Sequence, residues 1–198
     1  MIAALAFWRR PYDQPVRLFF AMSTAAMGTF AAGHHWWVIA GSQWLLLPFV
    51  TCAALLPTLT LHFFLAFPRP RPPLSGFPAF TIGGLYLPPA LAVLGLLLIV
   101  NYANWLSGGD TAGDHIGILH QALGLLRTGV YAYFVIAALL FAAAIIALAF
   151  SYSAARTPIE QSQLRWMLWA GLAAVIPVGY AIYLSQTDAV GFALGRAP

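Results

Sequence analysis

The sequence predicts an all-α fold: a polytopic integral membrane helix bundle of about five transmembrane helices, forming one domain over residues 1–198. Hydrophobic residues make up 62% of the chain and charged residues only 7%, which leaves too little polar surface for a soluble domain of ordinary size. No stretch alternates with period two, and lipid accepts only helices or closed barrels. Five apolar stretches each approach the ~20 residues that a helix needs to cross a ~30 Å hydrocarbon core. The expected spans are 16–33, 44–67, 78–100, 126–150 and 164–184.

The arginines predict the orientation of these spans. All nine basic residues are arginine, and seven of them share one side of the membrane if the N-terminus is cytoplasmic, as the positive-inside rule requires. The tryptophans agree, because each falls at an expected headgroup boundary. We therefore predict a protein of the bacterial inner (cytoplasmic) membrane, with the tail 185–198 outside. The inner arginines are Arg9, Arg10, Arg17, Arg69, Arg71, Arg156 and Arg165, and the outer ones are Arg127 and Arg196.

Three shorter segments border the spans. Thr157, Pro158 and Glu160 form a capping box, which predicts that the fifth helix begins in the inner loop. Residues 114–125 place apolar side chains on one face, which favours a short helix on the outer surface before the fourth span. Residues 1–8 are too few to span, so they form either an interfacial anchor or the end of an upstream helix. The sequence leaves both readings of residues 1–8 open.

Four histidines lie on the predicted outer side. If they converge at one depth, they could hold a metal, haem or pigment. Neither His34 and His35 nor His115 and His120 have the i, i+4 spacing of ligands on one helix. Histidines at the membrane interface also serve simply as amphipathic boundary residues. No cofactor is predicted, and haem or pigment binding stays open as the alternative. These residues are His34, His35, His115 and His120.

His62 is the only ionisable residue expected deep within a span. Such groups are costly in lipid and usually face the bundle interior or an aqueous cavity. A hydrogen bond from the ring to a neighbouring helix explains the residue structurally. A sensing or proton-coupled role is the functional alternative, because imidazole titrates near physiological pH.

Four prolines interrupt the expected spans, namely Pro57, Pro88, Pro89 and Pro177. Each removes a backbone N–H, frees a carbonyl four residues earlier and bends its helix. Kinks of this kind serve as hinges or simply as packing features. Pro57 and Pro88 lie at similar depth, so we expect them to line a cavity in which water or a lipophilic ligand satisfies the freed carbonyls. Arg127, at the outer end of the fourth span, is a further sensing or packing candidate.

Catalytic motifs are absent from the sequence. It contains no nucleophile with its base, phosphate-binding glycine loop, paired carboxylates or zinc-protease helix. All five acidic residues fall in loops or at helix ends, and Cys52 is expected to pack as a small hydrophobe. No basic cluster is long enough to bind nucleic acid. We therefore expect no enzyme activity in this chain.

Three segments resemble the multi-helix N-terminal membrane region of bacterial sensor histidine kinases. Residues 61–71, LHFFLAFPRPR, resemble the close of one of its helices, and residues 156–166, RTPIEQSQLRW, resemble the loop that enters a later helix. Residues 7–19, which contain FWRRP and RLF, resemble its first inner loop. The resemblance implies a membrane-embedded signal-input module in which a ligand, lipid or membrane property shifts the helix packing and a homodimer transmits the change.

The chain departs from that family in its output. It has no phosphoacceptor histidine followed by an acid and no ATP-binding glycine segment, so the catalytic part is expected in a longer parent, after at least one more span beyond Pro198. The alternative is a small accessory subunit of a respiratory or photosynthetic complex, bound to partner membrane subunits. A transporter is the third choice, because the spans show no clear inverted repeat.

Overall fold

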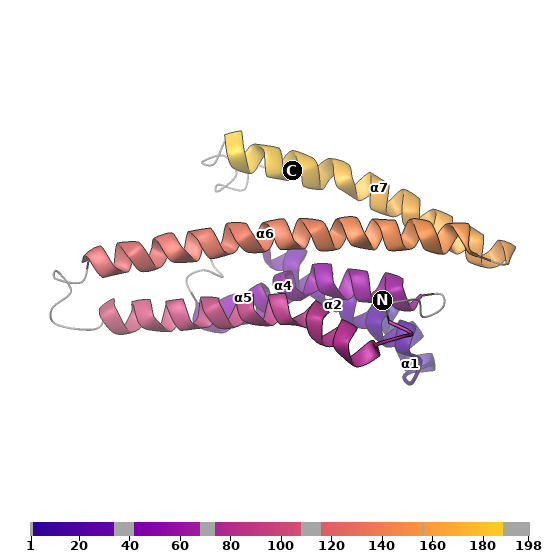
Figure 1. The fold of residues 1–198 in the computed structure, drawn as a ribbon, viewed down its shortest axis with the longest axis horizontal. Coiled ribbons are helices and arrows are strands. Elements are labelled where there is room, and N and C mark those ends of the chain that lie inside the picture. The colour runs from indigo at the N-terminus through magenta and orange to yellow at the C-terminus, as the bar shows by residue number, and fades with distance from the viewer. Residues whose placement is uncertain (1, 34–41, 68–73, 108–115, 156, 188–198) are drawn as a thin grey trace.

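The computed structural model describes residues 2–33, 42–67, 74–107, 116–155 and 157–187, and over these residues the chain is all-α, without strands (Figure 1). The all-α prediction is confirmed. The helices are α1 (Ile2–Arg9), α2 (Gln14–Gly33), α4 (Gln43–Ala66), α5 (Pro78–Ser107), α6 (Ile116–Ser153) and α7 (Pro158–Thr187).

Three helical segments among the described residues are long and apolar enough to cross a membrane: Trp44–Ala66, Pro78–Tyr102 and His120–Ser153. They coincide with the second, third and fourth expected spans. Helices also cover the first and fifth expected spans, but α2 and α7 are not among the three. Too few consecutive side chains are described in α2 and in α7 for these two helices to be judged in the same way.

Helix α4 is the centre of the bundle. It packs against α2, α5 and α6, whereas among the described residues α1 packs on α2, and α7 packs mainly on α6 and places Met167 against the α2–α4 core. Burial of apolar side chains between α2 and α4 builds the main hydrophobic core, in which Phe19 and Phe63 lie with ring centroids 5.8 Å apart. The buried core residues are Leu18, Ala25, Leu56, Leu59, Phe63, Ala66 and Leu74.

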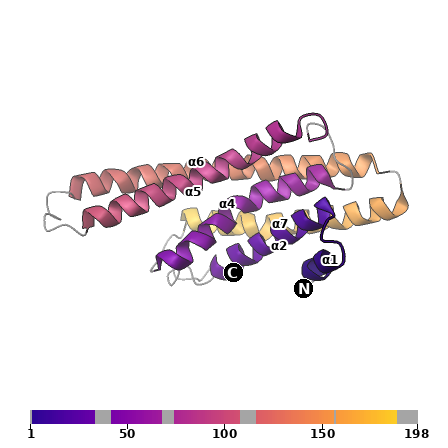
Figure 2. The same ribbon diagram turned by 90° about the horizontal axis from the view of Figure 1, so that it is seen from below.

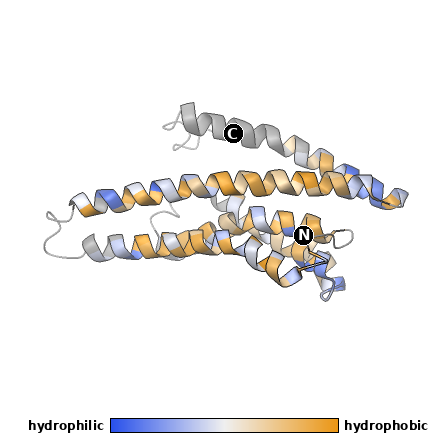
Figure 3. Ribbon diagram, viewed as in Figure 1, coloured by the Kyte–Doolittle hydropathy of each residue, from blue (hydrophilic) through white to orange (hydrophobic). Residues whose placement is uncertain are grey.

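Helix α6 corrects the expectation of a separate surface helix at 114–125. The structure has one continuous helix of 38 residues from Ile116 to Ser153, about 57 Å long at 1.5 Å per residue. This segment contains no proline, and extending a helix avoids the cost of nucleating a new one. The middle of α6 is apolar, and hydrophilic residues gather near its N-terminal end and at the α6–α7 turn (Figure 3).

The described arginines divide between the two ends of the bundle. The α1–α2 turn, the C-terminus of α4, the start of α5 and the α6–α7 turn lie at the same end (Figures 1 and 2). Arg9, Arg10, Arg17 and Arg165 belong to this end, whereas Arg127 lies nearer the other end of α6. Four of the five described arginines therefore lie toward one end of the bundle.

The start of α7 agrees with the predicted cap. Pro158 is the first helical residue, and the backbone N–H of Glu160 donates to Thr157 Oγ1 at 3.2 Å. This bond satisfies one of the free N–H groups of the first turn. From this turn α7 runs back beside α6 and diverges from it toward its own C-terminus (Figure 1).

Candidate functional site

A line of hydrogen-bonding groups runs along one side of α4. Ala54, Thr58 and His62 recur every four residues and therefore lie close to one face of the helix. The backbone carbonyl of Ala54, the hydroxyl of Thr58 and the ring of His62 each bond to another helix. We call these three groups the α4 polar stripe.

Thr58 joins α4 to a carbonyl in α5 that proline has freed. Pro89 has no N–H, so the carbonyl of Leu85, four residues earlier, lacks its helical partner. Thr58 Oγ1 donates to this Leu85 oxygen over 3.3 Å, and the Thr58 side chain is fully buried. The neighbouring helix thus supplies the hydrogen bond that the α5 backbone cannot make, as an apolar environment requires.

Tyr133 makes the corresponding contact between α6 and α4. Pro57 interrupts the backbone hydrogen bonds of its turn in α4. The hydroxyl of Tyr133 donates to the backbone oxygen of Ala54 in that same turn. The two proline-interrupted turns, one in α4 and one in α5, are each hydrogen-bonded to a side chain from an adjacent helix.

His62 completes the stripe. Its Nδ1 lies 3.1 Å from the hydroxyl oxygen of Tyr86 in α5, and the two rings meet edge to face with centroids 5.8 Å apart. Only 6% of the His62 surface is exposed, and Nε2 is buried without a hydrogen-bond partner among the described residues. With the proton on Nδ1 the ring donates to Tyr86, and with the proton on Nε2 it accepts from Tyr86. The pair can therefore reverse the direction of its bond by changing tautomer.

The prolines lie within the helices where the sequence placed them, and the expected cavity between Pro57 and Pro88 stays a prediction. Pro57 and Pro89 are buried between helices, and Pro88 is half-buried. The Thr58 hydroxyl donates to the Leu85 carbonyl, which Pro89 frees, and the Tyr133 hydroxyl donates to the Ala54 carbonyl, next to the Ala53 carbonyl that Pro57 frees. The helices approach closely enough for a threonine and a tyrosine to reach these carbonyls.

Two hollows occur elsewhere, both toward the opposite end of α5 from its prolines. One, of about 50 Å³, lies between α4 and α5 beside Val50 and Asn101. The other, of about 380 Å³, lies between α5 and α6 beside Tyr102 and Gln121. Neither is lined by a proline or by His62. The first is smaller than the roughly 300–1,000 Å³ typical of small-molecule sites.

The remaining candidate residues do not join the stripe. Arg127 is exposed, with its guanidinium carbon 5.6 Å from the ring centroid of Tyr131, one turn along α6. His120 is exposed on α6, and Pro177 falls within α7. The predicted convergence of outer histidines falls outside the described residues, which omit His34, His35 and His115. No group of three or more potential metal ligands occurs within the described ranges.

Sequence reasoning missed four polar residues. Thr58, Tyr86 and Tyr133 supply the partners of the stripe, and the signal that could have found them is the presence of hydroxyl residues at the depth of the prolines. Ser151, in α6 near the α6–α7 turn, is completely buried, and its Oγ has no partner among the described residues. No sequence pattern distinguished Ser151.

Comparison of this chain with protein-family models, with curated proteins and with solved structures finds no match.

Proposed function

We propose that this chain is a five-span membrane protein that serves as the signal-input module of a two-component-type sensor kinase. In this arrangement α2 and α7 are the first and fifth spans, and the arginine-rich end of the bundle faces the cytoplasm. Arg17 is close to the N-terminus of α2, so its long side chain reaches the headgroup layer. Helix α7 enters the membrane after its polar first turns.

The α4 polar stripe is the observation that carries the proposal. A signal-input module requires a helix interface with two packings of similar free energy. Interhelical hydrogen bonds in membranes contribute about 0.6 kcal/mol each, so the three bonds of the stripe amount to about 2 kcal/mol. A ligand or lipid that binds the alternative packing about 30-fold more tightly offsets that difference. Helix α4 is well placed for such a shift, because it contacts three neighbours.

The His62–Tyr86 pair provides the variants that test this function. In the natural reading frame that contains this chain, Tyr86→Phe removes one hydroxyl and leaves the ring, and His62→Leu removes both ring nitrogens. We expect either change to alter basal autophosphorylation in native membranes several-fold while membrane insertion stays normal, because lipid accepts Phe and Leu readily. The control is Tyr102→Phe, an exposed tyrosine of the same helix α5.

Two results contradict the proposal. One is unchanged kinase output in both pair variants, which makes the stripe a packing feature only. The other is a reading frame without a kinase, from a chain that co-purifies from native membranes with coloured subunits. The second result favours an accessory subunit of a respiratory or photosynthetic complex.

A further inference from the structure

Helix α1 uses only one of its faces to pack on α2. Ala3 is buried on that face, and Phe7 stacks on Phe20 of α2 with ring centroids 4.8 Å apart and planes 19° apart. The other face carries Ile2, Leu5 and Trp8, which are 82%, 60% and 88% exposed. These three recur every three residues, so they form a continuous apolar stripe turned away from α2.

The direction of α1 differs from that of the long helices. It lies across the long axis of the bundle, and Figure 2 shows it nearly end-on at the end where α2 begins. Eight residues of helix are about 12 Å long, far less than the ~30 Å hydrocarbon core. A short helix that crosses the spans and exposes large apolar side chains has the geometry of a helix lying in the membrane interface.

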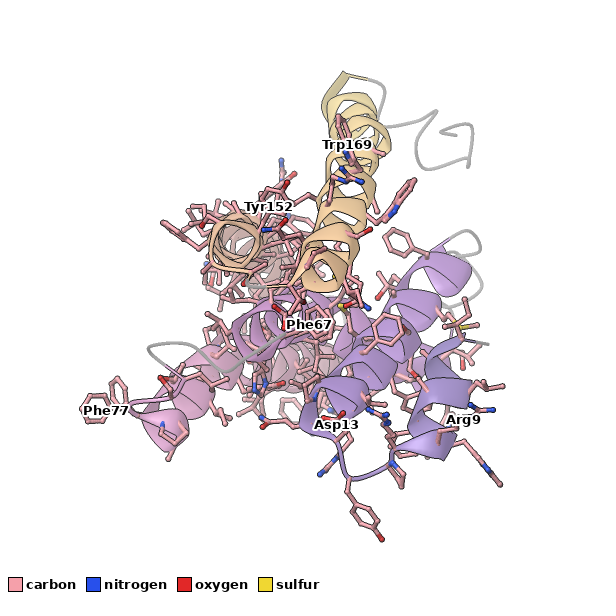
Figure 4. All side chains as sticks on the ribbon, turned by 90° about the vertical axis from the view of Figure 1, so that its right-hand side faces the viewer. Arg9, Asp13, Phe67, Phe77, Tyr152 and Trp169 are labelled. Atoms are coloured by element: carbon pink, nitrogen blue, oxygen red, sulfur yellow. The ribbon has the colours of Figure 1, made fainter. Side chains whose placement is uncertain are left out.

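Positive charge adjoins the apolar stripe. Residues 2–17 contain Arg9, Arg10 and Arg17 but a single acid, Asp13. All three arginines are exposed, and none forms an ion pair within the part of the chain that the structure describes. Arg9 lies at the periphery of the bundle, whereas Phe67 lies near its centre (Figure 4). Unpaired guanidinium groups beside an apolar stripe complement a phosphate headgroup attached to acyl chains.

We propose that α1, together with Arg9 and Arg10, forms a binding surface for anionic phospholipids. Ile2, Leu5 and Trp8 insert between the acyl chains, and the two guanidinium groups hold the headgroup phosphate. The charge beside the apolar stripe favours lipid over a second copy of the chain, because a symmetric α1–α1 contact would bring the arginines of the two copies together. This surface is independent of the α4 polar stripe and of the proposed signalling role.

A lipid titration tests the headgroup contact. The full chain is purified in detergent, and phosphatidylglycerol or phosphatidylcholine is added while thermal unfolding is followed. We expect phosphatidylglycerol to stabilise the chain at a lower concentration than phosphatidylcholine. The variant Arg9→Gln/Arg10→Gln should raise the half-maximal phosphatidylglycerol concentration by about fivefold for each arginine. The control Arg165→Gln, an exposed arginine of α7, should leave it unchanged.

A second measurement tests the apolar stripe. Leu5→Cys in a Cys52→Ala background is labelled with an environment-sensitive fluorophore and placed in phosphatidylglycerol nanodiscs containing spin-labelled lipid. Strong quenching is expected, and quenching should weaken when Arg9 and Arg10 are also replaced. Equal stabilisation by the two lipids, or an unquenched label, overturns the proposal. Efficient disulfide formation between two copies through Leu5→Cys also overturns it, in favour of a dimer contact.

Discussion

At the scale of single residues, the prolines of α4 and α5 are accommodated by hydroxyl groups from other helices. Thr58 bonds to the carbonyl that Pro89 frees, and Tyr133 bonds to the turn that Pro57 interrupts. An unsatisfied backbone carbonyl is costly in hydrocarbon, so the Thr58 hydroxyl removes a penalty in addition to joining α4 and α5, whereas the Tyr133 hydroxyl adds a second bond to a carbonyl that keeps its helical partner. His62 contrasts with them, because one of its nitrogens remains unpartnered among the described residues.

Thr58→Val tests the link between the hydroxyl and the proline. Valine keeps the shape of threonine but cannot donate to Leu85. We expect the variant to lose about 0.6 to 1.7 kcal/mol of stability, between the average and the largest value measured for interhelical hydrogen bonds in membranes. Thermal unfolding in detergent should show this as a decrease in Tm of about 2–4 °C per kcal/mol.

Pro89→Ala supplies the matched control for this bond. Alanine restores the N–H at position 89, so the Leu85 carbonyl regains its helical partner. In that background Thr58→Val should cost clearly less than in the native chain. Equal losses in the two backgrounds would show that Thr58 acts through packing alone.

At the scale of helices, α2 and α4 approach each other closely at Gly28. A Cβ atom built at Gly28 would lie 2.8 Å from Cys52 Sγ and 3.1 Å from Cys52 Cβ. Small residues at such interfaces let helix backbones approach, and close approach creates the dispersion contacts that hold membrane helices together. The α2–α4 core of leucine, alanine and phenylalanine side chains depends on this spacing.

Gly28→Ala should therefore destabilise the bundle. The added methyl group has no free space, and overpacking of this kind costs about 1–3 kcal/mol. Gly129→Ala in α6 is the control, because nothing lies within 4 Å of a Cβ at that position. Alanine there should be neutral or slightly stabilising, since it favours helix more than glycine does. Comparable thermal stabilities of the two variants would contradict the close approach of α2 and α4 at Gly28.

At the scale of the whole molecule, the apolar helix segments and the described arginines follow one pattern. Apolar segments of α4, α5 and α6 lie side by side, and most described arginines gather at one end of the bundle. From this distribution the positive-inside rule predicts a cytoplasmic location for the α1–α2 end.

Cysteine labelling tests this orientation. In a Cys52→Ala background, a cysteine replacing Gly108 should react with an impermeant thiol reagent in intact cells. A cysteine replacing Ser153, next to the α6–α7 turn, should react only after the cells are opened. The opposite pattern would reverse the orientation of the whole bundle, because the two positions flank the same helix.

The sequence by itself determined the helical class, the approximate positions of the helices and the cap at Thr157. These features depend on local properties: runs of apolar residues, the absence of strand periodicity, and a hydroxyl three residues before Glu160. It also identified His62 and the prolines as unusual, because polar groups and missing N–H groups are costly in any apolar helix.

Only the tertiary structure decided which groups bond to His62 and to the helix turns that contain the prolines. Thr58 and Leu85 are 27 residues apart in the chain, and Tyr133 and Ala54 are 79 apart, so no local pattern could pair them. Helix packing brought these atoms together. The same holds for α1, whose sequence fits several roles. Its direction across the bundle and its uncovered face arise from packing on α2, a contact that periodicity alone does not encode.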